Sequence, residues 1–485
     1  MRAKSTDLKC LWVAQMSSTT DPPVESPNPL RNAEFRKLFA AQVIALVGTG
    51  LSTVALTLLA YDLVGGNAAA VLGTALAFKM VAYVVFAPIV GGLAHRFARK
   101  PFLIIMDVIR AGIVLLMPFV TQVWQIYLLI FLLNLFSAGF KPVFAATIPD
   151  ILPEDRTYTR ALSMSRLAYD LENLLSPTFA AIALLFTTYS GLFSANSVAF
   201  LVSAVLIIFT TLPQSRKVAR LGNVWNEISF GTVAYFKTPR LRALFALYLG
   251  VSAASAMVIV NTVIYVKDTL GMTSTGVAAA LAASGGGSMI AALSLPRILD
   301  KTPDRPVMLL GGVLMAIGVA LIGIGPSFVQ MLPFWFLVGV GWSAVQTPAG
   351  RVVNRSSSPS DRSAFFSAQF ALSHACWLLF YPVAGQLGTR VGVEATAIWL
   401  AACIAFFTVL AAWLWPKEDA QVLVHEHPTV VHSHAHSHDE HHEHSHEGAE
   451  AGEEHAHEHV HEPVRHAHSF VIDDHHASWP ASSTP

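Results

Sequence analysis

The sequence predicts an all-α membrane protein with twelve transmembrane helices, arranged as two six-helix repeats between disordered termini. Three observations lead to this fold class. The chain is 54% hydrophobic and only 13% charged, whereas a typical soluble domain has about 25% charged residues. It contains twelve apolar runs of about 20 residues, the length that crosses a hydrocarbon core about 30 Å thick. Sequence features of the first half recur in the second half at a nearly constant offset.

The apolar runs follow one another through short connections, with one longer basic segment in the middle of the chain. Because backbone polar groups cannot remain unpaired in lipid, each run is expected to be a helix. The predicted spans are 39–61, 70–93, 102–121, 123–146, 163–187, 191–212, 243–266, 275–295, 306–325, 328–347, 364–388 and 394–415.

Composition divides the chain into five segments. We expect a disordered cytoplasmic leader at 1–34, bundles of six helices at 35–213 and 241–416, a cytoplasmic middle loop at 214–240 and a disordered His-rich tail at 417–485. The last part of the middle loop has the pattern of a short interfacial helix.

Basic residues of the short loops fall on one side of the predicted membrane, and the opposite loops contain little beyond Lys267 and Arg390. The positive-inside rule makes the first side cytoplasmic, and an even number of spans then places both termini in the cytoplasm. We therefore expect a multi-pass membrane protein with both termini in the cytoplasm. The basic residues of the loops are Arg96, Arg99, Lys100, Arg156, Arg160, Arg297, Lys301, Arg305, Arg351, Arg355 and Arg362.

The repeat is visible at two places. The set Pro142, Pro153, Asp155 and Arg156 recurs 206 residues later as Pro348, Pro359, Asp361 and Arg362. The basic loop that begins at Gly91 recurs 205 residues later around Asp300 and Lys301. Two related bundles imply a substrate site between them near the middle of the membrane, with alternating access to its two sides.

The basic loop after the second span resembles the signature loop of the major facilitator superfamily, Gly-x-x-x-Asp-Arg-x-Gly-Arg-Lys/Arg. It departs from that pattern at His95 and Ala98. The resemblance implies the major facilitator fold over about 35–415 and a cytoplasmic gate. The residues assigned to gating are Gly91, His95, Arg96, Arg99, Lys100, Asp107, Arg110, Asp300 and Lys301.

The segment from Arg160 to Pro177, RALSMSRLAYDLENLLSP, resembles the nickel-resistance exporters of that superfamily (NreB/NrsD-like), and the His-rich C-terminus adds to this resemblance. The resemblance implies export of Ni²⁺ from the cytoplasm, with Co²⁺ as a second cargo, and a location in the bacterial inner membrane. The body of the chain also resembles siderophore and macrolide exporters.

Eighteen of the 20 histidines lie between His425 and His476, and this segment contains ten His-x-His pairs. Imidazole is a good ligand for Ni²⁺, Zn²⁺, Cu²⁺ and Co²⁺, so the tail is expected to bind these ions with low selectivity. An inert solvated tail and a pH-sensing tail are the alternatives. The expected metal-binding residues of the tail are His425, His427, His432, His434, His436, His438, His441, His442, His444, His446, His455, His457, His459, His461, His466 and His468.

Ionisable side chains inside membrane spans are expensive, so each is a candidate for function. The fifth span contains Asp170, Glu172 and Asn173, and its repeat partner, the eleventh, contains His374 and Cys376. These five residues are the candidates for the transport or metal path. An ion pair within the helix is the alternative for Asp170, with Arg166 as partner, and a buried apolar role is the alternative for Cys376. Lys79 in the second span needs water or an acid such as Asp62 nearby.

Together with the resemblance to nickel-resistance exporters, which supplies the nickel cargo and the direction, these patterns predict a secondary exporter of Ni²⁺, with Co²⁺ as a further cargo, that exchanges the ion for protons and confers metal resistance. Protons, the metal ion and the lipid bilayer are the expected partners of a monomer. Efflux of a drug or siderophore with a metal-sensing tail is one alternative, and a membrane-anchored metal store or sensor is another. No enzymatic motif, permanently bound cofactor, nucleic-acid module or ATP-binding loop is predicted.

Overall fold

The computed structural model describes residues 28–64, 68–213, 224–417, 419, 422–426, 430–436, 455–461, 465–473, 476 and 478–480. The described membrane body consists of helices. Its long helices are α2 (Ala33–Val64), α3 (Ala68–Leu93), α4 (Arg99–Leu116), α5 (Val123–Ile151), α6 (Asp155–Ala183), α7 (Tyr189–Ile208), α8 (Val224–Lys237), α9 (Pro239–Ala256), α11 (Ser274–Leu299), α12 (Asp304–Ala320), α13 (Phe328–Asn354), α14 (Arg362–Val391) and α15 (Val393–Leu414).

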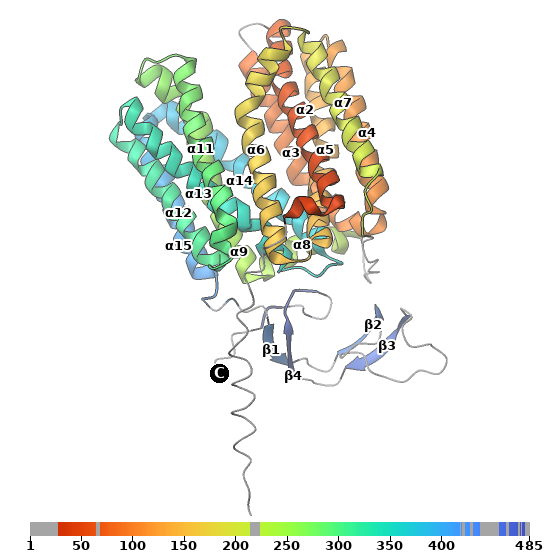
Figure 1. Cartoon of the computed structure of the whole chain (residues 1–485). Helices are drawn as coiled ribbons and strands as arrows, with labels where there is room; N and C mark the ends of the chain where they lie inside the picture. Colours follow the sequence, from red (N-terminus) through yellow and green to blue (C-terminus); the bar gives the residue numbers. More distant parts are fainter. Residues whose placement is uncertain are drawn as a thin grey trace, which may run out of the picture.

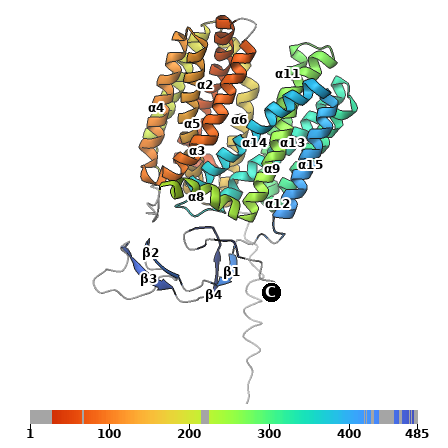
Figure 2. The same ribbon diagram turned by 180° about the vertical axis from the view of Figure 1, so that it is seen from behind.

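The helices form two bundles, α2–α7 and α9–α15, as Figures 1 and 2 show. Helix α9 continues through η5 (Met257–Asn261), α10 (Thr262–Ile264) and η6 (Tyr265–Thr269). Helix α8 lies across one end of the two bundles, which we call the α8 end. The bundles meet at this end and diverge toward the opposite end (Figure 1). The α8 end is the side that the sequence predicts to be cytoplasmic.

Among the described residues, eleven helical segments are long and apolar enough to cross a membrane. Helix α6 is not one of them, although it has 29 residues and packs against α2 and α11. The reason lies in its polar residues, since Arg166, Asp170 and Glu172 interrupt its apolar face. With α6, the helices match the predicted spans one for one, and the predicted fold of two six-helix repeats is confirmed.

The two bundles are held together mainly by α3 against α14 and by α6 against α11. At the first contact the helices approach so closely that a Cβ atom on Gly91 would lie 2.2 Å from Cβ of Ser367. Only glycine fits there, which gives Gly91 of the signature loop a steric role at the α8 end. Helix α8 packs across this contact, against both α3 and α14.

The tail corrects one expectation, because part of it is not disordered. Its described residues form two antiparallel ribbons beyond the α8 end (Figure 1), built from β1 (Val422–Glu426) with β4 (Arg465–Ser469) and β2 (Val430–His436) with β3 (His455–His461). Low complexity suggested disorder, but the alternating His-x-His pattern also has the period of a strand.

Both ends of the tail also contact the C-terminal bundle. Near its start, Asp419 pairs with Arg240 at 3.2 Å and with Arg355. Near its end, Phe470 and Ile472 are buried in the core of this bundle, and the Trp479 ring centroid lies 5.2 Å from the Arg240 guanidinium. These apolar residues interrupt the His-rich sequence and gain free energy by burial, so the tail is attached to the body at two points.

Candidate functional site

Charged side chains close the α8 end between the two bundles. Asp150, at the end of α5, forms ion pairs with Arg99 of α4 and with Arg362 of α14. Both guanidiniums are largely buried, with exposed fractions of 3% and 11%. Because Arg362 belongs to the C-terminal bundle and Asp150 to the N-terminal bundle, this gate cluster (Arg99, Asp150 and Arg362) ties the two halves together.

The pair of Arg99 and Asp150 has a counterpart in the second half. Asp304 and Arg355 lie 205 residues further along the chain (304 − 99 and 355 − 150), the offset that relates the two basic loops. They pair at 3.6 Å, with the positive and negative residues exchanged. In the second half, however, Asp419 of the tail binds Arg355 as well. Asp419 of the tail therefore joins the ion-pair network of the second half.

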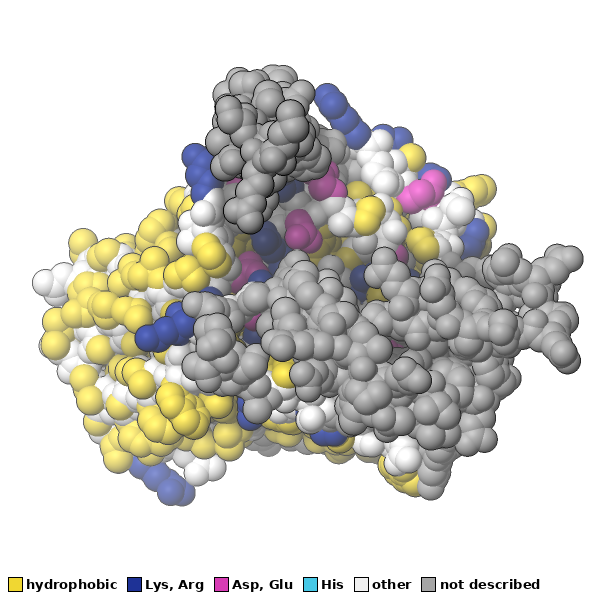
Figure 3. Space-filling view, turned by 90° about the horizontal axis from the view of Figure 1, so that it is seen from below, with side chains coloured by type: hydrophobic (Ala, Val, Ile, Leu, Met, Phe, Trp, Pro, Cys, Tyr) yellow, Lys and Arg dark blue, Asp and Glu magenta, His cyan; other side chains and the backbone are white. Residues whose placement is uncertain are grey.

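Further cross-contacts involve residues that the sequence assigned to gating. Arg96 donates to Glu227 of α8 at 2.9 Å, and Arg156 of α6 lies 3.8 Å from Asp300 of α11. Arg351 of α13 donates to Thr159 of α6 at 2.8 Å. Figure 3, a view onto the α8 end, shows acidic side chains near the middle with basic side chains around them.

Asp107 and Arg110 form a buried ion pair inside the N-terminal bundle, where Ser203 donates to Asp107 at 2.7 Å. The Arg110 guanidinium lies between the rings of Phe140 and Phe200. This surrounding supports a structural role for the pair. Lys100 and Lys301 stay predictions as gating residues, and the side chain of His95 lies outside the described part of the structure.

Deeper in the membrane, Asp170 is held by an ion pair with Arg166 at 2.7 Å, as the alternative interpretation predicted. Ser288 of α11 donates to the other carboxylate oxygen at 2.6 Å. Arg166 also donates to Gln346 of α13 at 3.2 Å. Asp170 and Arg166 therefore form a neutral bridge between the two bundles.

A second group of polar side chains lies at mid-depth between α3, α5, α6 and α14. We call Lys79, Tyr83, Lys141, Glu172 and His374 the central cluster. The Lys141 ammonium donates to the Tyr83 hydroxyl at 3.1 Å and lies 5.0 Å from the centroid of its ring. The Lys79 ammonium lies 5.9 Å from the same centroid. The ammonium groups of both lysines therefore lie within cation–π distance of the Tyr83 ring.

His374 lies among aromatic rings and, within the described part of the chain, forms no ion pair with a carboxylate. Its ring centroid is 4.7 Å from Tyr83, 4.2 Å from Phe370 and 4.8 Å from Trp377. Its Nδ1 atom is 2.6 Å from the carbonyl oxygen of Phe370, which fits an Nδ1–H donor and leaves Nε2 for another contact.

Glu172 supplies the negative charge of the central cluster. It interacts electrostatically with Lys141 and Lys79, but in the described structure it forms an ion pair with neither. At 1.5 Å per helical residue, the charged members and His374 lie about 15 to 26 Å from the α8 end of their helices. This depth is close to the middle of a bilayer, where the substrate site of a transporter with two related bundles is expected.

The candidate metal ligands do not converge. Among the described residues, no group of three or more His, Cys, Asp or Glu side chains is arranged to hold a metal ion. Asp170 is paired with Arg166, and Cys376 is buried in an apolar core with 2% of its surface exposed. The Asn173 side chain lies outside the described part. The assignment of these residues to a metal path stays a prediction.

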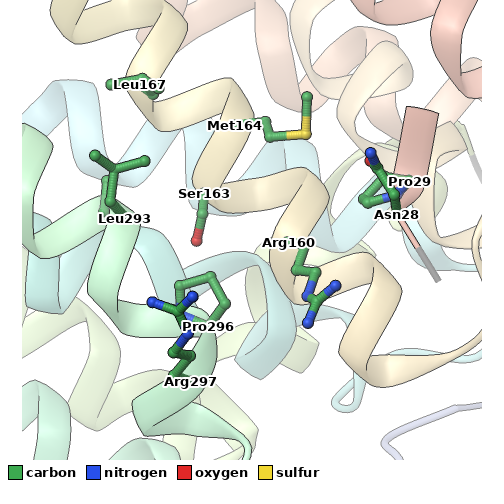
Figure 4. A pocket seen from close by; sticks show the side chains of 10 residues that line it. Asn28, Pro29, Arg160, Ser163, Met164, Leu167, Leu293, Pro296 and Arg297 are labelled. Atoms are coloured by element: carbon green, nitrogen blue, oxygen red, sulfur yellow. The ribbon is translucent and has the colours of Figure 1, made fainter. Parts of the chain in front are cut away.

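A pocket of about 420 Å³ lies between α6 and α11 toward the α8 end. Figure 4 shows Arg160 and Ser163 on α6 near Pro296 and Arg297 of α11. The described residues that line the pocket include no His, Cys, Asp or Glu. The pocket therefore lacks the usual metal ligands.

Sequence reasoning overlooked Lys141, Tyr83 and Asp150. Lys141 has the same signal as Lys79, a lone cation in an apolar run, and so could have been found. Tyr83 and Asp150 carry no such signal, because tyrosine is common in membrane helices and Asp150 is close to the end of its span. Their roles follow from contacts with the other bundle, which a single sequence does not contain.

Comparison with known proteins identifies the family that shares this architecture. A family model described as Major Facilitator Superfamily matches residues 38–303 and 244–433. An uncharacterized MFS-type transporter, YfiS of Bacillus subtilis, is 29% identical over 175 residues, which are 36% of this chain and 41% of that protein. Macrolide efflux protein A of Streptococcus pyogenes is 23% identical over 186 residues, 37% of this chain and 45% of that protein. This chain thus aligns with less than half the length of these curated relatives.

Solved structures share the fold. The human organic anion transporter MFSD10 (TETRAN) superposes with a TM-score of 0.70 at 13% identity, covering 79% of this chain and all of that one. The fucose:proton symporter FucP of E. coli gives a TM-score of 0.62 at 13% identity, covering 79% of this chain and 98% of that one. The family model and the two six-helix bundles agree, and the chain belongs to the Major Facilitator Superfamily.

Proposed function

We propose that this protein is an exporter of an organic compound, working by alternating access between its two bundles. The central cluster carries this proposal, because it places charged and aromatic side chains between the bundles at mid-membrane depth. Family membership supports a transport function. The curated relative named for macrolide efflux supports export and an organic cargo.

The structure fits one state of the proposed cycle. The gate cluster joins the bundles at the α8 end, whereas the bundles diverge toward the opposite end (Figure 2). If the α8 end is cytoplasmic, as the basic loops predict, this state is closed to the cytoplasm and can release cargo outward.

The second candidate function is export of Ni²⁺ or Co²⁺ in exchange for protons, with Asp170, Glu172 and His374 releasing the ion when protonated. One observation favours it. The register of β2 and β3 places His432 opposite His459, His434 opposite His457 and His436 opposite His455. This register pairs histidines of one strand with histidines of the other, and imidazole is a good ligand for Ni²⁺ and Co²⁺.

Transport in proteoliposomes separates the two functions. The full-length protein is reconstituted and tested with ⁶³Ni²⁺ and with naphthalene-based organic probes of different charge. The proposed function predicts protein-dependent movement of at least one organic probe and little movement of ⁶³Ni²⁺. Movement of ⁶³Ni²⁺ alone, coupled to an opposing proton gradient, would reject organic export and establish the metal exporter.

A further inference from the structure

The central cluster contains more positive charge than negative charge. Lys79 and Lys141 contribute two positive charges and Glu172 one negative charge, which leaves a formal charge of 2 − 1 = +1. Arg166 and Asp170 neutralise each other in their own ion pair. Neither lysine forms an ion pair within the described residues. Since an uncompensated charge in the membrane is expensive, the cluster is arranged to receive an anion.

The hydrogen-bonding groups of the cluster point to the same chemistry. Each lysine ammonium has three donors and no acceptor, and the Tyr83 hydroxyl already accepts from Lys141, so its own proton can be donated. The buried Nε1 atom of Trp377, beside His374, has no hydrogen-bond partner among the described residues. The site therefore offers several donors for an oxyanion, with Glu172 as the one competing carboxylate.

Rings surround these donors. Tyr83, Phe370, His374 and Trp377 contact one another edge to face or in tilted stacks, with centroids 4.2 to 4.9 Å apart. Such a wall stacks well against a flat apolar group. A hydrated metal cation would gain little from it and would be repelled by two ammonium groups.

We propose that the central cluster binds an organic monoanion, with its carboxylate, sulfonate or similar group at Lys79 and Lys141 and an aromatic group against His374. This inference rests on the proposed function and names its substrate class. The loaded site is then neutral and the empty site carries one positive charge. Each export cycle therefore moves one negative charge outward, and a membrane potential that is negative inside drives export by about 2.3 kcal/mol per 100 mV.

Equilibrium binding to the purified full-length protein tests the charge class. The probes are naphthalene-2-sulfonate, the neutral naphthalene-2-sulfonamide and the cationic 2-naphthylmethylammonium. The sulfonate should bind at least tenfold more tightly than the cation. Lys79→Gln and Lys141→Gln should each weaken sulfonate binding on the order of tenfold, whereas binding of the sulfonamide should change little. Lys267→Gln, at an exposed lysine of η6, is the matched control and should leave all three affinities unchanged.

Two results would overturn the inference in different ways. If the cation or the neutral probe binds as well as the sulfonate, or if both lysine variants keep wild-type affinity for it, the anion class is wrong while an organic cargo stands. If none of the three probes binds and the same preparation moves ⁶³Ni²⁺, the proposed function fails together with the inference. Thermal unfolding of each variant distinguishes loss of binding from loss of fold.

Discussion

The gate cluster and the central cluster have the same composition of charge and a different geometry. Each combines two cations with one carboxylate, giving a formal charge of +1. In the gate cluster, Asp150 contacts both arginines. In the central cluster, roughly 20 Å away along the helices, Glu172 forms an ion pair with neither lysine among the described residues. The comparison shows that two clusters of equal charge can differ in whether the carboxylate is paired with its cations. Pairing closes the gate cluster, whereas the unpaired lysines of the central cluster stay available for cargo.

The largest effect should come from breaking the gate cluster. Asp150→Asn leaves two largely buried guanidiniums without their carboxylate, which should lower the free energy of unfolding by about 3 kcal/mol or more. Thermal unfolding in detergent measures this loss. Asp300→Asn is the matched control, because its partner Arg156 is 54% exposed, and it should cost less than about 1 kcal/mol. Equal losses in the two variants would refute a special role for the buried contact.

A smaller loss should follow removal of the tail's first contact. A chain ending at Lys417 lacks Asp419, so Arg240, which is 1% exposed, loses its carboxylate partner, whereas a chain ending at Ala420 retains it. The shorter chain should be less stable by about 1.5–3 kcal/mol, measured as a lower midpoint of denaturation. Both chains lack the His-rich segment and the contacts of Phe470 and Trp479. Identical midpoints would show that the Asp419 network does not stabilise the body.

The central cluster gives a prediction whose sign is opposite to that of the lysine variants. Glu172→Gln removes the carboxylate that competes with an anion for Lys79 and Lys141. Naphthalene-2-sulfonate should therefore bind several-fold more tightly, on the order of 1 kcal/mol at an effective dielectric constant of about 20. Equilibrium dialysis on the purified variant measures the change. Weaker sulfonate binding, or ⁶³Ni²⁺ binding in the wild type that the substitution abolishes, would instead make Glu172 a cargo ligand.

The smallest expected effect separates packing from ligation at His374. Phenylalanine keeps a ring against Tyr83 and Trp377 and alanine does not, so His374→Ala should weaken sulfonate binding by about 0.5–1.5 kcal/mol and His374→Phe by less. If histidine ligates a metal ion, the two variants should both lose ⁶³Ni²⁺ transport. Binding titrations with naphthalene-2-sulfonate and transport assays with ⁶³Ni²⁺, each on wild type, His374→Phe and His374→Ala, distinguish these roles.

Hydropathy and the internal repeat were sufficient to predict the helices and their division into two bundles. The bilayer requires apolar helical runs of about 20 residues, and the recurring features mark where the second bundle begins. The intrahelical pair of Arg166 and Asp170 was also within reach, since four residues make one helical turn. The gate cluster was only partly predictable. Arg99 belongs to a recognisable loop, but its partner Asp150 is 51 residues away and is selected by packing between α4 and α5.

The least predictable features depend on contacts between the bundles. His374 and Glu172 looked like metal ligands because imidazole and carboxylate bind metals wherever they converge. In the structure, Tyr83 and the two lysines lie beside them, and these neighbours come from helices far apart in the sequence. The tail shows the same limit, since its composition indicated metal binding but not its attachment through Asp419 and Trp479.

The surplus charge of the central cluster is tested most directly by transport under a controlled membrane potential. Proteoliposomes containing the full-length protein are loaded with naphthalene-2-sulfonate, and valinomycin with a hundredfold potassium gradient sets about 120 mV, negative on the side from which the sulfonate leaves. Efflux should be faster than at zero potential and should slow when the gradient is reversed, with Lys267→Gln behaving as wild type and Lys141→Gln losing most of the flux. Efflux that ignores the potential, or that requires an opposing proton gradient instead, would contradict the account.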